Sequence, residues 1–164
     1  MSQGKKLEWG QAQENAFQTL KQHMCSAPIL RMPDWNKEMV LQTDASNYGV
    51  SGCLLQEVEG VRHPVLYVSR KLKPAERNYS TIEKECLAVV FAISKLQHYL
   101  YGNEFVLETD HRPLTWMRTK DHQNARVTRW NLALQPYNFR IRNIKGRDAI
   151  WADALSRLPL SHEN

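Results

Sequence analysis

The spacing of apolar residues changes several times along the chain, and each change marks a different element. Over residues 8–25 apolar side chains recur every three or four positions, which predicts an amphipathic helix. The pattern then becomes that of strands, with runs at residues 39–44, 50–58 and 63–69. Glu59-Gly60 is a turn dipeptide between the last two runs. We therefore expect an antiparallel meander of three strands.

The second half of the chain opens with its strongest helical pattern, which predicts one helix over about residues 81–101. Ser80 with Glu83 three positions later is the signature of a capping box, and Gly102 is a stop signal. The remaining predicted elements are a strand at 104–109, a short helix from Pro113, a helix at about 126–135, a strand at 137–144 and a helix at 148–158. This order predicts an α/β (mixed α+β) fold, with a five-stranded mixed sheet flanked by helices.

Composition narrows the class of protein. The chain has 164 residues, 42% hydrophobic and 24% charged, which fits a globular protein and excludes disorder. Apolar runs are shorter than the roughly 18 residues of a membrane span, and residues 1–6 are too polar for a secretory signal. The three cysteines are too scattered for a disulfide framework. We therefore expect a cytoplasmic or nuclear protein that is not secreted and has no membrane partner.

The charge is unevenly distributed. Residues 112–147 hold nine basic side chains and one acidic one, so this stretch carries +8 and the rest of the chain −3. Aromatic residues such as Trp116, Trp130 and Tyr137 lie between the basic ones. A local excess of this kind, interleaved with aromatics, favours a surface that binds a polyanion.

Four carboxylates stand at unusual positions. Asp44 and Asp110 end predicted strands, Glu85 lies beside the apolar stripe of the long helix, and Asp153 lies among apolar residues of the last helix. Each alone fits turn chemistry or a solvent-facing position. Brought together, they would repel one another unless cations lay between them, and oxygen ligands suit Mg²⁺ or Mn²⁺. Paired cations about 4 Å apart are a common device for phosphodiester cleavage.

Several motifs in the chain are similar to one known family. They are Thr43-Asp44-Ala45-Ser46, the run from His63 to Leu72, the run from Asn78 to Glu85, Thr109-Asp110-His111-Arg112-Pro113-Leu114, and Ala152-Asp153-Ala154-Leu155-Ser156-Arg157. Together they resemble the ribonuclease H domain of Gypsy-type LTR retrotransposon polyproteins, from about Trp9 to Leu158. Residues 1–35 resemble the helix and linker that follow the polymerase, and residues 36–160 the ribonuclease H domain itself.

The resemblance implies a ribonuclease H fold and metal-dependent cleavage of the RNA strand of an RNA–DNA hybrid. Its catalytic and metal-binding carboxylates carry over onto Asp44, Glu85, Asp110 and Asp153, with two Mg²⁺ ions as cofactor and Mn²⁺ as a substitute. Glu85 is chosen over Glu83 because it directly precedes a small apolar run and the capping box already explains Glu83. The implied partners are the hybrid and the polymerase portion of the same polyprotein.

Substrate contacts are expected from side chains around this site. They are Ser46, Arg70, Lys71, Ser80, Thr81, His111, Arg126 and Arg129. Ser80 serves equally well as a helix cap, and Arg70 and Lys71 as a solvated turn. Many cellular ribonucleases H carry a mobile histidine before the last helix; the corresponding loop here has none, and His111 is only a weak substitute.

A second interpretation is a module that binds without cutting. The connection domain of retroviral reverse transcriptases resembles this sequence but has lost the carboxylates, and a host-domesticated copy would bind hybrid or protein partners. The presence of all four acids favours the enzyme. An element-encoded chain is expected in a cytoplasmic virus-like particle and a domesticated one in the nucleus. The sequence leaves the oligomeric state open.

Overall fold

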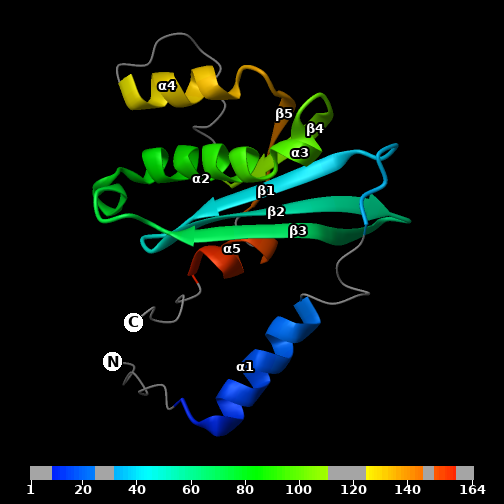
Figure 1. Ribbon diagram of the computed structural model, residues 1–164, viewed down its shortest axis with the longest axis vertical. Coiled ribbons are helices and arrows are strands. Elements are labelled where there is room, and N and C mark those ends of the chain that lie inside the picture. The colour runs from blue at the N-terminus through cyan, green and yellow to red at the C-terminus, as the bar shows by residue number, and fades with distance from the viewer. Residues whose placement is uncertain (1–8, 25–31, 111–124, 146–149, 158–164) are drawn as a thin grey trace.

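The computed structural model describes residues 9–24, 32–110, 125–145 and 150–157 (Figure 1). Its elements in chain order are α1 (Gln11–Met24), β1 (Met39–Ala45), β2 (Gly49–Val58), β3 (Val61–Lys71), η1 (Glu76–Asn78), α2 (Thr81–Lys95), α3 (Gln97–Leu100), β4 (Glu104–Thr109), α4 (Ala125–Leu134), β5 (Asn138–Asn143) and α5 (Ile150–Arg157). The predicted short helix from Pro113, His111 and the proposed cap Asp148 lie outside the described residues.

The five strands form one mixed sheet in the order β3-β2-β1-β4-β5. The first three strands are the antiparallel meander that the sequence predicts. Glu59 and Gly60 both have positive φ, 54° and 77°, as a tight hairpin turn of the primed type requires. Strands β1 and β4 are parallel neighbours, and so are β4 and β5. The predicted α/β class and five-stranded mixed sheet are therefore confirmed.

Helices cover the two faces of the sheet unequally. Helices α2 and α4 lie on one side and α5 on the other (Figure 1). Alternation along β1 sends Leu41 into the main core under α2 and Val40 to the opposite face. Helix α2 approaches β2 closely at Gly52, where a Cβ atom would lie 2.6 Å from the Cβ of Ala92. The missing side chain of Gly52 thus lets α2 settle against the centre of the sheet.

The long helix predicted over residues 81–101 is interrupted. Helix α2 ends at Lys95, Leu96 has non-helical dihedrals (φ −102°, ψ 16°), and α3 is a separate short turn. Leu96 and Leu100 are both fully buried. Because both side chains still reach the core, the apolar spacing continues across the break and conceals it in the sequence.

Helix α1 matches its predicted position closely, and none of its side chains between Gln11 and Gln22 is buried. Trp9 and Leu20 are exposed, and Trp9 contacts Phe17 edge-on at 5.8 Å. Figure 1 shows α1 apart from the layered sheet and helices. The division into residues 1–35 and 36–160 stays a prediction. Among the helices in the described part of the chain, none is both long and apolar enough to cross a membrane.

Candidate metal centre

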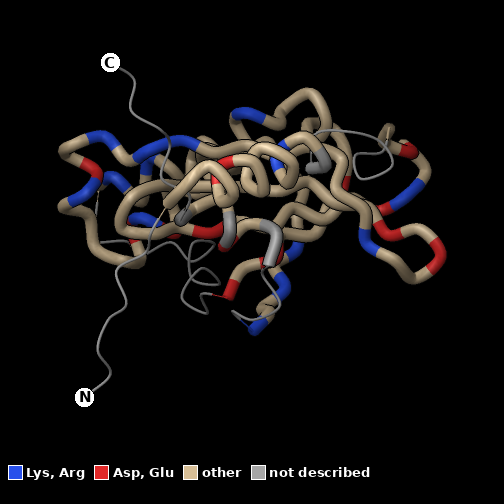
Figure 2. Tube along the Cα trace, turned by 90° about the horizontal axis from the view of Figure 1, so that it is seen from below, with Lys and Arg blue, Asp and Glu red and all other residues tan. Residues whose placement is uncertain are grey.

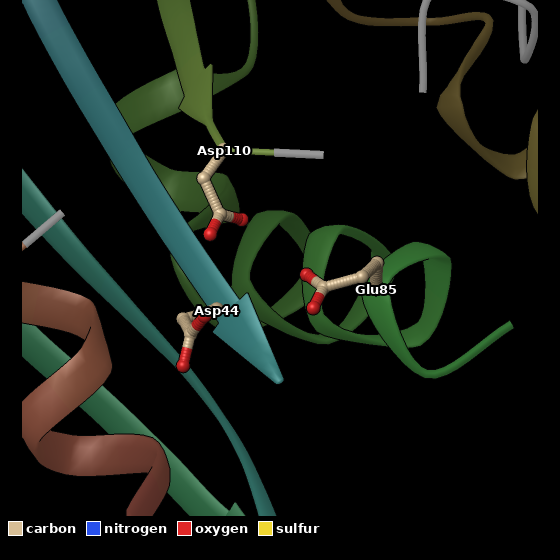
Figure 3. Close-up of side chains that lie close together, drawn as sticks. All are labelled: Asp44, Glu85 and Asp110. Carbon is tan, nitrogen blue, oxygen red and sulfur yellow. The ribbon is translucent and has the colours of Figure 1, made fainter. Parts of the chain in front are cut away.

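Three carboxylates meet at one edge of the sheet. Strands β1 and β4 run parallel with Gln42 opposite Glu108, and Asp44 and Asp110 stand two residues further on. Parallel neighbours end at the same edge, which is where open α/β sheets place their ligands. Glu85, in α2, faces this edge (Figure 3). One carboxylate oxygen from each of Asp44, Glu85 and Asp110 lies within 4.8 Å of the other two.

The environment of Glu85 is unfavourable for a negative charge. The residue is only 4% exposed. Burial, and then the nearby charges of Asp44 and Asp110, raise the pKa of Glu85 to about 8, against a smaller opposing effect of the hydrogen bond from the Ala45 N–H. Its Oε2 atom is buried with no hydrogen-bond partner among the described residues. A buried, unpartnered oxygen between two other carboxylates fits a cation-binding role.

The donor set matches a hard divalent cation. All three side chains offer oxygen, the ligand that Mg²⁺ and Mn²⁺ prefer, and Asp110 is exposed, so the centre opens to solvent. Magnesium commonly keeps several waters and takes only one or two protein carboxylates together with substrate phosphates. The cluster can therefore hold a divalent cation such as Mg²⁺ or Mn²⁺.

Asp153 lies in α5 and not in the elements that carry the other three acids. It is half-buried in α5, on the other side of the sheet, and is not one of the three residues whose oxygens lie within 4.8 Å of one another. Its helix nevertheless contacts the centre, because the Ser156 hydroxyl donates a hydrogen bond to Oδ2 of Asp44. The catalytic and metal-binding roles of all four acids stay predictions.

The capping box at the start of α2 is confirmed. The Glu83 N–H donates to the Ser80 hydroxyl at 3.3 Å, and the Ser80 N–H donates to the Glu83 carboxylate at 2.9 Å. Glu83 also forms an ion pair with Arg126 at 2.6 Å. Glu83 and Glu85 thus point to different surroundings, as residues two apart on a helix must.

Arg70, one of the expected substrate contacts, is already engaged within the protein. Arg70 forms a bidentate ion pair with Glu76, at 2.6 and 3.0 Å, and its guanidinium lies 5.2 Å from the centroid of the Phe91 ring. Arg70 is half-buried in β3 and not in a solvated turn, and its contact with the hybrid stays a prediction. Lys71, at the end of β3, is exposed. Its contact with substrate stays a prediction.

A polar groove of about 430 Å³ lies beside the carboxylates. Its lining residues are Ala45, Ser46, Asn47, Tyr48, Thr81 and Lys84. Lys84 brings a positive charge and donates to Asn47 Oδ1 at 3.1 Å. Thr81, exposed in the first turn of α2, lies where backbone N–H groups favour an anion. The Ser46 hydroxyl holds the β1–β2 turn by accepting from the N–H groups of Tyr48 and Gly49.

The basic stretch is partly neutralised. Arg126 pairs with Glu83 and lies 3.9 Å from the centroid of the Tyr79 ring, so it joins α4 to the start of α2. Arg142 pairs with Glu108 at 3.2 Å, and Arg140 pairs with Glu38. Arg129 is exposed. Most Lys and Arg residues of the chain lie outside this stretch, and Figure 2 shows them spread over several parts of the described trace.

Sequence reasoning missed two groups near these sites. Ser156, which bonds to Asp44, follows Asp153 by three residues and so shares its helix face, a spacing that would have marked it. The second group is Glu108 with Arg62, a fully buried carboxylate held by an arginine from another strand. No local pattern links residues 46 positions apart.

The family model and the relatives that match this chain point to the same protein family. Residues 34–137 match the model of the RNase H-like domain found in reverse transcriptase. The chain is 42% identical over 149 residues to the Retrovirus-related Pol polyprotein from transposon 297 of Drosophila melanogaster, covering 91% of this chain and 14% of the relative. It is 40% identical over 163 residues to the polyprotein from transposon gypsy of the same species, covering 98% and 15%.

Solved structures agree on the fold. Prototype foamy virus protease-reverse transcriptase superposes with a TM-score of 0.69 at 16% identity, over 87% of this chain and 20% of that one. LC11-RNase H1 in complex with RNA/DNA hybrid superposes with a TM-score of 0.54 at 14% identity, over 72% and 93%. The chain spans only about a seventh of the two polyproteins above. It belongs to the family of RNase H-like domains found in reverse transcriptases, and its relatives are retroelement Pol polyproteins.

Proposed function

We infer that this chain is an endonuclease that cleaves the RNA strand of RNA–DNA hybrids. The observation that carries the proposal is Glu85, a buried carboxylate whose nearest ionisable neighbours include two further acids at the carboxyl edge of the sheet. Membership of the RNase H-like family supports the reaction class. The hybrids bound to LC11-RNase H1 and to a foamy viral protease-reverse transcriptase support the substrate class.

Residues at different positions around the centre would have different roles in cleavage. Asp44, Glu85 and Asp110 would hold divalent cations, with Asp153 joining from α5. Two such ions, when bound, supply a nucleophilic water and stabilise the departing 3′ oxygen in an in-line displacement. The groove beside Thr81 and Lys84 would hold a backbone phosphate, because it combines a positive side chain with the N-terminal end of α2.

The proposed setting is a polyprotein in which the polymerase makes the hybrid that this domain then degrades. Arg129 would add electrostatic affinity without sequence preference, since phosphates are common to all sequences. Arg126 has a second role, because its ion pair with Glu83 also holds α4 against α2. A loss of binding on replacing Arg126 therefore needs a stability measurement beside it, whereas Arg129 alone reports on hybrid binding.

The test is cleavage of end-labelled RNA–DNA hybrid by the purified chain with Mg²⁺ or with EDTA. We expect internal cuts in the RNA strand only with Mg²⁺, and an intact DNA duplex, because the 2′-hydroxyl distinguishes the strands. Asp44→Asn keeps the side-chain volume and removes a charge, so it should abolish cutting while the circular dichroism spectrum is retained. Hybrid binding without Mg²⁺-dependent cutting by the wild-type chain would favour the connection-like or domesticated module instead.

A further inference from the structure

Helix α5 is fastened to the sheet by serine hydroxyls. Ser51, in β2, donates from Oγ to the carbonyl oxygen of Ala152 at 2.7 Å, and both residues are fully buried. Ser46, in the β1–β2 turn, donates from Oγ to the carbonyl oxygen of Ser156 at 2.5 Å. A Cβ atom on Gly49 would lie 3.2 Å from this same carbonyl oxygen, so the two backbones approach closely. These contacts bind the backbone of α5 to the sheet, so the side chains of α5 remain available for other contacts.

Ser156 acts in the opposite direction, from the helix toward the sheet. Its side chain is buried, with 1% of the residue exposed, and its Oγ donates to Oδ2 of Asp44, 112 residues away in the chain. The same Oγ lies 3.0 Å from the carbonyl oxygen of Asp153. A hydroxyl carries one proton, and a charged carboxylate is the stronger acceptor. The hydrogen bond to Asp44 therefore prevails when Asp44 is ionised.

We propose that Ser156 is a positioning residue that fixes the Asp44 carboxylate and thereby sets the metal affinity of the centre. The terminal torsion of an aspartate is broad and has no sharp minimum of its own, so an unrestrained carboxylate would rotate. A hydrogen bond to one oxygen holds the plane of the group and the direction of the other oxygen. Outer partners of metal-ligating carboxylates typically contribute 10- to 100-fold in metal affinity or activity. This inference rests on the proposed function, since it assumes that Asp44 binds the cation.

The chain offers a matched control in Ser51. Ser51→Ala and Ser156→Ala each remove one buried serine hydroxyl between α5 and the sheet. The Ser51 hydroxyl lies 3.4 Å from the backbone carbonyl oxygen of Asp44, whereas the Ser156 hydroxyl bonds to the Asp44 carboxylate. If the serine hydroxyls serve only to pack α5 against the sheet, the two variants should have the same metal affinity. If the Asp44 carboxylate has to be held, they should differ in metal binding.

The experiment measures Mn²⁺ affinity by titration calorimetry on the full chain, with urea unfolding midpoints measured without metal. We expect both variants to lose similar stability, while Ser156→Ala binds Mn²⁺ about 10- to 100-fold more weakly and Ser51→Ala stays within about twofold of wild type. Ser156→Thr keeps the hydroxyl and should recover part of the affinity.

Three results would overturn the inference: unchanged Mn²⁺ affinity in Ser156→Ala, equal weakening in Ser51→Ala, or a wild-type chain that binds no Mn²⁺. Failure of the proposed function is separate from the first two. A wild-type chain that binds Mn²⁺ and never cuts hybrid contradicts the nuclease, whereas a cutting enzyme whose metal affinity ignores Ser156 contradicts only the positioning role.

Discussion

Two buried glutamates on opposite faces of the sheet meet contrasting environments. Glu108, fully buried, accepts hydrogen bonds from Arg62 at 2.8 and 2.9 Å, from Gln42 at 2.9 Å and from Arg142 at 3.2 Å. Burial alone would raise the pKa of Glu108, but the hydrogen bonds from Arg62 and Gln42 hold it below its usual value. Glu85, nearly as buried, faces two other acids, and burial raises the pKa of Glu85 to about 8.

The difference shows that burial does not identify a functional carboxylate. A buried charge needs partners, and Glu108 has all of its partners inside the protein. Glu85 lacks a basic partner among the described residues and needs one from outside, which a divalent cation would supply. Glu108 is therefore interpreted as a structural clamp and Glu85 as a proposed cation ligand.

The largest expected effect is on cleavage by Glu85→Gln. Replacing a ligand should lower the cleavage rate by more than the 10- to 100-fold typical of outer partners, so we expect a loss above about 100-fold. Unfolding by urea in the absence of metal should show equal or higher stability, since repulsion is relieved. Glu83→Gln serves as the control and should retain most activity, because glutamine can still bond to the Ser80 N–H. An inactive Glu83→Gln beside an active Glu85→Gln would reverse the assignment.

The pH dependence of stability should have opposite signs for the two glutamates. The pKa of Glu85 is raised from 4.5 to about 8 in the folded state, so the folded form binds the extra proton. Metal-free stability should therefore fall as pH rises from about 5 to about 8, by at most about 4 kcal/mol for one proton. The pKa of Glu108 is lowered in the folded state. The stabilisation by its charged form is therefore present at pH values above the usual glutamate pKa, and it is lost as the pH falls through the folded-state pKa.

Urea midpoints measured from below the usual pKa of Glu108 up to about pH 8 would give both slopes. Saturating Mg²⁺ should flatten the slope between about pH 5 and 8, because the cation then takes the place of the proton on Glu85. In the absence of metal, Glu85→Gln should also remove this slope. A metal-free slope that persists in Glu85→Gln would assign the titration to another group.

A smaller effect is expected from breaking the clamp with Arg62→Met. The methionine keeps much of the apolar stem and removes the bidentate pair, which leaves Glu108 with Arg142 and Gln42. Removing one partner of a buried pair costs about 3–5 kcal/mol, and the remaining partners should reduce this to about 2–3 kcal/mol. Urea unfolding at neutral pH gives the value. Mn²⁺ affinity should be unchanged, since Glu108 is not one of the three clustered carboxylates, and a large loss of affinity would show that the clamp and the centre are coupled.

The smallest expected effect is the loss of the cap in Glu83→Ala. This change removes one half of the capping box and the ion pair with Arg126, whose side chain is 37% exposed. Lost caps cost about 1 kcal/mol and exposed pairs less, so the sum should stay near 1 kcal/mol. Glu83→Gln keeps the cap and loses the ion pair, so urea midpoints of the two variants would separate the cap from the ion pair. A loss of stability in Glu83→Ala as large as that of Arg62→Met would contradict this ranking.

Local patterns in the sequence predicted most elements because local physics forms them. The Ser80–Glu83 capping box, the Glu59-Gly60 turn and the strand alternation involve residues only a few positions apart, so their signatures are visible in the chain. The sequence did not reveal the break in the helix at Leu96, because Leu96 and Leu100 are both buried and keep the apolar spacing of a continuous helix.

By itself the sequence determined the fold class, the family resemblance and the acids worth examining. Only the tertiary structure decided that Asp44, Glu85 and Asp110 gather at the edge where β1 and β4 end in parallel. It likewise decided that Arg62 clamps Glu108 and that Ser156 reaches Asp44. The physical reason is distance along the chain. Spacing reports the local conformation of neighbouring residues, whereas a contact between residues 46 or 112 positions apart depends on strand order and on how the helices pack.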